Sequence, residues 1–144
     1  MEDRVLKRDN ADDPHQSVRE VPGLTEEDVA AVWAKGTVVT VPAGWSMIHE
    51  HEPPDNAYLI LEGRTRVTLD RETVAHLGPG DFVGEIAPVA HRLRTATVTA
   101  VEPLLTLDFP AAVFAQLRSE VPRFDQAVTT VATQRVEEID RAAP

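Results

Sequence analysis

The spacing of hydrophobic residues changes twice along the chain, from helical to alternating and back to helical. The first helical segment follows Thr25, which has Asp28 three positions later, and it runs up to Gly36. A threonine with an acidic residue at this spacing approximates a capping box, and glycine is the usual residue just beyond a helix. The pattern therefore predicts an N-terminal helix that ends at Gly36.

Short runs rich in β-branched and apolar residues follow, separated by glycine and proline. The expected strands cover residues 37–41, 57–62, 64–69, 73–77, 93–101 and 104–108, with turns at residues 42–44, 62–63, 70–72 and 78–80. Short strands with such regular turns are typical of a small jelly-roll sandwich or barrel. The expected core consists of apolar strand residues: Val39, Val41, Tyr58, Ile60, Val67, Leu69, Leu77, Phe82, Val98, Leu105 and Leu107.

Helical spacing returns after residue 108. Pro110 is expected in the first turn of a helix that runs to about Glu120, because proline is favoured there. A second helix is expected from Pro122 onward, with an apolar stripe formed by Phe124, Val128, Val131, Ala132, Val136 and Ile139. The predicted fold class is therefore mostly β: a jelly-roll β-barrel with an N-terminal helix and two C-terminal helices.

The N-terminal end differs in composition from the rest of the chain. Residues 1–22 are rich in Asp, Arg, Lys and Gln, with Pro14 and Pro22 as breakers, which predicts a mobile tail with one fragment of helix. Residues 23–144 suffice for one domain with its own core, and no second domain is expected.

The charge balance excludes one class of partner. The chain has 14 Lys and Arg against 24 Asp and Glu, a formal net charge of −10 at pH 7. Binding to a nucleic-acid backbone needs clustered Lys and Arg, so direct binding to nucleic acid is not expected. The sequence has no cysteine, no signal-peptide pattern and no apolar run of membrane-spanning length. A soluble, cytoplasmic protein without a membrane partner is therefore the expectation.

Residues 82–98 are the strongest candidate for a functional site. A Gly-Glu pair opens an expected turn of helix, and Arg94, Ala96 and Val98 share one face of the strand that follows, because side chains alternate. An arginine on a face of small apolar residues points inward and needs an anionic partner. That partner is either Glu85, in a fixed ion pair, or a small anion held by amides at the start of the short helix.

This stretch resembles the phosphate-binding cassette of cyclic-nucleotide-binding domains. The resemblance is carried by Gly84-Glu85-Ile86-Ala87 and by the later run Leu93-Arg94-Thr95-Ala96-Thr97-Val98, and it extends over residues 24–140. It implies a non-enzymatic regulatory sensor that binds a cyclic nucleotide. Cyclic AMP is the expected ligand, and cyclic GMP is the alternative. The resemblance also implies that binding repositions the C-terminal helix, which in many members pairs with its copy in a homodimer.

The resemblance assigns roles to individual residues. Arg94 and the backbone amides of Ile86, Ala87 and Ala96 would hold the cyclic phosphate, because one negative charge matches a planar guanidinium and converging N–H groups. Glu85 would bind the ribose 2′-hydroxyl. The other implied contacts are Gly84 in the cassette, the Thr95 hydroxyl, and Val67 and Val74 against the base. For these two valines, ordinary core packing is an equal alternative.

The cassette departs from the family pattern at two positions. Leu93 stands where the family usually has proline, and Pro88 stands where it has a leucine-like residue. Pro88 removes an amide and disfavours the α conformation for Ala87. A module that has lost its ligand and binds a partner protein is therefore an alternative. No helix-turn-helix, kinase motif or channel segment accompanies the cassette, so any effector is an unknown protein.

The histidines allow a second interpretation. His49 and His51 lie on one face of an extended segment, and His91 follows later in the chain. The arrangement resembles the metal-binding motifs of cupins, which share the jelly-roll architecture, and imidazoles with a carboxylate suit Fe, Ni, Zn or Mn. Asn56 stands where the first cupin motif has its glutamate. A cupin-like metal site also gives no reason for the Gly84-Glu85 pair.

Overall fold

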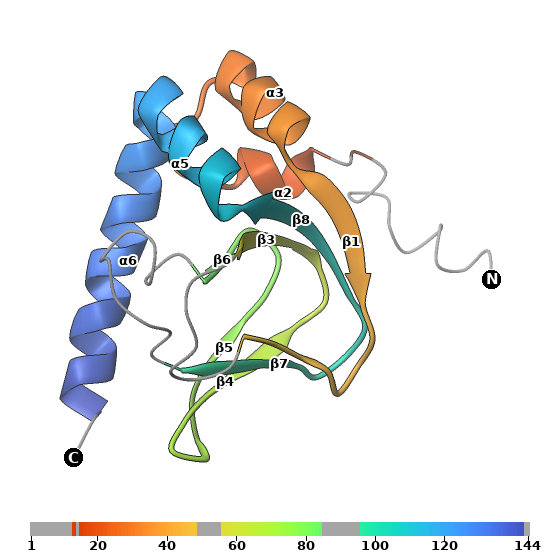
Figure 1. Cartoon of the computed structure of the whole chain (residues 1–144), viewed down its shortest axis with the longest axis vertical. Coiled ribbons are helices and arrows are strands. Elements are labelled where there is room, and N and C mark those ends of the chain that lie inside the picture. Colours follow the sequence, from red (N-terminus) through yellow and green to blue (C-terminus); the bar gives the residue numbers. More distant parts are fainter. Residues whose placement is uncertain (1–12, 14, 49–55, 85–95, 143–144) are drawn as a thin grey trace.

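Helices and two β-sheets are stacked in layers in this protein (Figure 1). The structure is a computed structural model that describes residues 13, 15–48, 56–84 and 96–142. Its helices are α2 (Gln16–Arg19), α3 (Glu26–Lys35), α5 (Ala111–Glu120) and α6 (Pro122–Ala142). Its strands are β1 (Thr37–Val41), β2 (Ser46–Ile48), β3 (Asn56–Glu62), β4 (Thr65–Leu69), β5 (Glu72–Leu77), β6 (Phe82–Val83), β7 (Thr97–Ala100) and β8 (Leu104–Pro110).

The strands pair into two antiparallel sheets with the orders β1-β8-β3-β6 and β2-β7-β4-β5. Among the described residues no strand of one sheet pairs with a strand of the other. The edge strands β6 and β2 have only 2 and 3 residues. They therefore offer few backbone N–H and C=O groups that could pair with a strand of the other sheet. The mostly β class with helices at both ends is confirmed, whereas the expected barrel is not closed.

Most expected strands are present within one or two residues of their predicted bounds. Strands β2 and β6 were not predicted, because runs this short show no alternation. The strand expected at 93–101 is represented by β7, and residues 93–95 lie outside the described ranges. The expected turn at 70–72 is a tight hairpin in which Asp70 and Arg71 have φ angles of 52° and 70°.

Helix α3 begins with the predicted capping box. The Asp28 backbone N–H donates to the Thr25 hydroxyl at 3.1 Å, and the Thr25 N–H donates to the Asp28 carboxylate at 3.1 Å. These two bonds satisfy donors that a helix start otherwise leaves without a partner. The expected end at Gly36 is also confirmed.

The larger hydrophobic core lies between the helices and the sheet that contains β3 and β8. Four phenylalanines dominate it: Phe82 from β6, Phe109 from β8, Phe114 from α5 and Phe124 from α6. The Phe124 ring contacts the other three at centroid distances of 5.7, 6.2 and 5.7 Å. Aromatic rings at such distances add to the stabilisation from buried area, so Phe124 fixes the start of α6 on the sheet.

The core also includes residues that were assigned to the N-terminal tail. Val18 in α2 is completely buried, and Val21 is 2% exposed. The Ser17 hydroxyl donates to the backbone carbonyl of Leu61 at 3.0 Å and ties α2 to β3. The packed domain therefore begins before residue 23. A helix of four residues is too short to show helical periodicity, so the sequence pattern does not reveal that α2 joins the core.

The expected core residues divide into two groups. The buried ones are Ile60, Val67, Phe82, Val98 and Leu107. The half-buried ones are Val39, Val41, Tyr58, Leu69, Leu77 and Leu105. Several of the second group lie on β1 and β5, the outer strands of their sheets, where packing is one-sided.

Helix α6 runs along the side of both sheets (Figure 1). Its predicted apolar stripe is buried at Phe124, Val128 and Ala132 and half-buried at Val131 and Val136, while the Ile139 side chain lies outside the description. Of the helices that the structure describes, none is long and apolar enough to cross a membrane.

We predict that Val18→Ala lowers the free energy of unfolding by about 2 kcal/mol, because it removes buried methyl groups and leaves a cavity. Chemical denaturation monitored by circular dichroism measures this change. Val38 is 46% exposed. The matched control Val38→Ala should therefore cost less than about 1 kcal/mol. Equal effects of the two substitutions would contradict a core role for α2.

Candidate functional site

A second apolar cluster fills the space between the two sheets. Its buried members come from both of them: Ile48, Ile60, Val67, Val83, Ala96 and Val98. Met47, Tyr58, Ala75 and Leu77 are half-buried against this cluster. The cluster contains both ends of the sheet connection that carries the predicted cassette, since Val83 ends β6 and Ala96 precedes β7.

Val67 lies in the middle of one sheet's inner face. The strand registers place Ile48 opposite Val98, Val98 opposite Val67, and Val67 opposite Ala75. Directly opposed residues on neighbouring strands point to the same face, so these four side chains form one apolar row across the sheet. Val67 is 8% exposed within this row. Val67 is thus part of the core between the sheets, and its contact with a base stays a prediction.

Val74 has a different environment from Val67. The register between β4 and β5 shifts after the pair Val67 and Ala75, since Thr68 is already paired with Thr73. Val74 is therefore the extra residue of a β-bulge, where the regular alternation of side chains is interrupted. Its side chain is 38% exposed. Val74 therefore lies outside the row of opposed residues that contains Val67.

Gly84 and Ala96 border the predicted cassette on its two sides. Gly84 has φ 85°, in the region that glycine adopts at no steric cost. Ala96 is 7% exposed and belongs, with Val98, to the cluster between the sheets. Ala96 and Val98 therefore share one face, as their alternate positions predict. The other predicted cassette residues, Glu85, Ile86, Ala87, Arg94 and Thr95, lie outside the described residues.

A carboxylate that was not predicted as a site residue lies on the inner face of the other sheet. Asp108 is opposite Thr37 on one side and Tyr58 on the other, and Tyr58 is opposite Val83. The Asn56 side-chain amide donates to Asp108 Oδ2 at 3.3 Å. Among the described residues Oδ1 of Asp108 is buried without a hydrogen-bond partner.

Burial raises the pKa of Asp108 above its ordinary value, and the hydrogen bond from Asn56 opposes this shift. A carboxylate loses hydration in a partly apolar environment, and one amide donor replaces only part of it. The sequence contains a signal for this residue. Leu104, Thr106 and Asp108 occupy alternate positions of one strand, so a charged residue follows two inward-facing ones.

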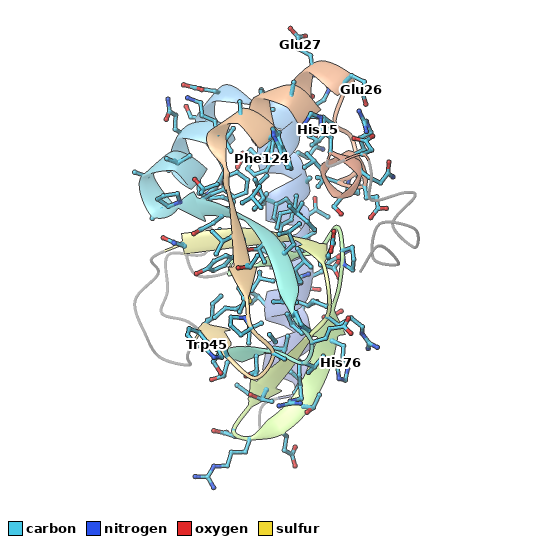
Figure 2. The ribbon with its side chains drawn as sticks, turned by 90° about the vertical axis from the view of Figure 1, so that its right-hand side faces the viewer. His15, Glu26, Glu27, Trp45, His76 and Phe124 are labelled. Carbon is cyan, nitrogen blue, oxygen red and sulfur yellow. The ribbon has the colours of Figure 1, made fainter. Side chains whose placement is uncertain are left out.

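The metal interpretation rests on residues that the structure does not describe, because His49, His51 and His91 lie outside the described ranges. Within those ranges no group of three or more His, Cys, Asp or Glu residues could hold a metal ion. In Figure 2 the two described histidines are well separated, with His15 near the helical end and His76 in the lower part of the molecule. The His15 ring is 4.7 Å from the Trp33 ring, and His76 is exposed.

Comparison with known sequences identifies one family. The sequence model of the cyclic nucleotide-binding domain family matches residues 38–120. A cyclic nucleotide-gated potassium channel of Mesorhizobium japonicum is 32% identical over 114 residues, which cover 79% of this chain and 30% of the channel. The chain spans between 7% and 30% of the length of the most similar curated relatives, which include fungal lysophospholipases.

Solved structures share the fold. The Thermus thermophilus catabolite activator protein has a TM-score of 0.75 at 23% identity, over 85% of this chain and 60% of its own. The cAMP-bound PfPKA-R structure has a TM-score of 0.74 at 19% identity, over 95% of this chain and 46% of its own. At these identities the likeness shows that the arrangement of sheets and flanking helices is the same.

We predict that Asp108→Asn gains stability relative to the parent as the pH rises from about 3 to 7. Because the folded-state pKa is raised, the native protein retains this proton to a higher pH than the unfolded chain does. The parent therefore loses stability as the pH rises through the folded-state pKa, and the neutral amide does not. We expect a relative gain of about 1 kcal/mol, since the carboxyl is only half-buried.

Urea denaturation at several pH values measures this difference. Glu72 is an exposed acid on β5, so Glu72→Gln is the control and should keep the parental pH dependence. A parallel pH dependence of Asp108→Asn and the parent would show that burial of Asp108 does not affect stability.

Proposed function

The chain belongs to the cyclic nucleotide-binding domain family, and from this membership we propose that it is a non-enzymatic sensor whose ligand is cyclic AMP. The observation that carries the proposal is the family match over residues 38–120, which includes the whole stretch from Gly84 to Val98. The described ends of that stretch support it. Gly84 has a conformation suited to glycine, and Ala96 is buried between the sheets.

The proposed ligand contacts follow the family cassette. Arg94 pairs with the cyclic phosphate, whose single negative charge suits a planar guanidinium. The amides of Ile86, Ala87 and Ala96 and the Thr95 hydroxyl complete the phosphate site, and Glu85 accepts a hydrogen bond from the ribose 2′-hydroxyl.

The proposed surface for the base starts from Val67, which offers an apolar side chain on the inner sheet face. Val74 would contribute from the bulge of β5, where its partly exposed side chain can lie against a ligand. The choice of cyclic AMP is supported by the shared fold of a cAMP-bound structure, PfPKA-R. Both cyclic AMP and cyclic GMP carry the same phosphate and ribose, so the base contacts decide between them.

We further propose that ligand binding moves α6 and that this movement is the signal. A ligand shifts a conformational equilibrium only by its differential affinity for the two states. The output then passes to a partner protein or to a second copy of the chain through α6. The first half of α6 is fixed in the core by Phe124 and Val128, so the movement is expected in its second half.

Isothermal titration with cyclic AMP and, in parallel, cyclic GMP tests the proposal. We predict one site per chain, with tighter binding of cyclic AMP, and a loss of affinity of about 100-fold or more in Arg94→Ala. The variant should keep the parental circular dichroism and melting temperature. Arg64 is exposed, so Arg64→Ala is the matched control and should bind like the parent.

The other outcomes separate the alternatives. If Arg94→Ala unfolds, Arg94 is a structural ion-pair partner. If neither nucleotide releases heat at high micromolar concentration, the sensor function is wrong. Metal analysis of the purified parent and of His49→Ala then distinguishes a cupin-like metal site from a ligand-free module that binds a partner protein. The family match favours the nucleotide interpretation over the metal one.

A further inference from the structure

Burial changes along helix α6. Phe124, Val128 and Ala132 are all buried, at intervals of one helical turn. Beyond Ala132 the described side chains are half-buried or exposed. Val136 continues the stripe as a half-buried residue, and Arg135, also half-buried, lies beside it, three positions after Ala132 on the same side of the helix. A cation therefore lies next to the apolar stripe where the helix leaves the core.

Arg135 contacts the strand that leads into the cassette. Its guanidinium Nη1 donates to the backbone carbonyl of Phe82 on β6. The preceding carbonyl, that of Asp81, accepts from the Ile60 N–H of the neighbouring strand. Successive carbonyls of a strand point to opposite sides, so the Phe82 carbonyl faces away from β3. Strand β6 is at the edge of its sheet, and Arg135 supplies a donor for an edge carbonyl.

Phe82 is thus held by α6 at two points. Its ring contacts the Phe124 ring at 5.7 Å, and its carbonyl accepts from Arg135. Phe124 and Arg135 lie about 16 Å apart along the helix axis, from the rise per residue. Helical side chains lean toward the helix N-terminus, so the long arginine reaches back to the same residue. Phe82 therefore connects both halves of α6 to the strand end.

The two attachments differ chemically. The aromatic contact is part of a buried core, which separates only when the domain unfolds. The hydrogen bond from Arg135 joins a half-buried guanidinium to an edge carbonyl, and both groups can exchange this bond for one with water. The second half of α6 can therefore be released while the first half stays in place.

From this geometry we propose that Arg135 is a positioning residue that latches residues 133–142 of α6 to β6. It thereby couples this part of the helix to Gly84 and the cassette. The latch itself rests on the described contacts, and its role in relaying ligand binding rests on the proposed function. Phe82 is only two residues before Gly84, so a change in the strand end alters the acceptor of the arginine directly.

Hydrogen–deuterium exchange of the full chain without ligand tests the latch. Arg135→Met should raise the exchange rates of amides 133–142 by about tenfold or more, because it removes the charge-assisted hydrogen bond to Phe82, and should leave amides 123–131 within twofold. Arg135→Lys keeps a donor and should give an intermediate increase. Arg141 is exposed on the same helix, and Arg141→Met should leave both segments like the parent.

Unchanged exchange of amides 133–142 in Arg135→Met would overturn the latch. A similar increase in Arg141→Met would also overturn it, because the effect would then come from the net charge. Addition of cyclic AMP tests the coupling. Ligand should change the exchange of amides 133–142 in the parent and not in Arg135→Met, and a ligand effect that persists in the variant would refute the coupling. If the parent binds no nucleotide in titration, the proposed function fails, while the ligand-free exchange still decides the latch.

Discussion

The whole fold depends on the antiparallel pairing of β3 with β8, because this pair is buried on both faces. Leu59 and Leu107 are opposite each other and face the helices, and neither is exposed. Ile60 and Thr106 are also opposite each other and equally buried, and Ile60 belongs to the cluster between the sheets. One strand pair therefore joins two cores. A shift of one residue in its register would exchange the residues that face the two layers.

Burial on both faces explains which elements the sequence predicts well. Strand β3 is visible as a continuous apolar run from Ala57 to Leu61, as expected for a strand buried on both faces, and helix α3 is marked by its cap at Thr25 and Asp28. Strands β2 and β6 have too few residues to show a period, and the same holds for α2. These short elements gain their structure from tertiary contacts. The buried Val18 is one example, since a lone valine in a polar segment carries no signal of its partners.

The residue pattern predicts less of the candidate site than of the helices and strands. Its cassette was found by family resemblance, since spacing alone indicates only an inward-facing arginine that needs an anion. Alternation correctly placed Ala96 and Val98 on one inner face. Alternation does not apply at Val74, because a β-bulge there inserts a residue that no local pattern announces. The predicted base contact of Val74 comes from the family resemblance alone. Asp108 lies in the strand expected at 104–108, and the structure extends this strand to Pro110, so helix α5 begins only at Ala111.

Asp108 and Arg135 are half-buried charged residues next to apolar surfaces, and each is connected to strand β6 by strand register or by a hydrogen bond. Asp108 is in the row of opposed residues that ends at Val83, and Arg135 donates to the carbonyl of Phe82. A half-buried charge lowers stability unless it gains compensating bonds, so proteins keep such residues mainly at functional sites. Strand β6 has only two residues, and few hydrogen bonds to β3 hold it. The bond from Arg135 and the ring of Phe124 therefore add contacts between α6 and this short strand, which is why the proposed coupling between Gly84 and α6 runs through β6.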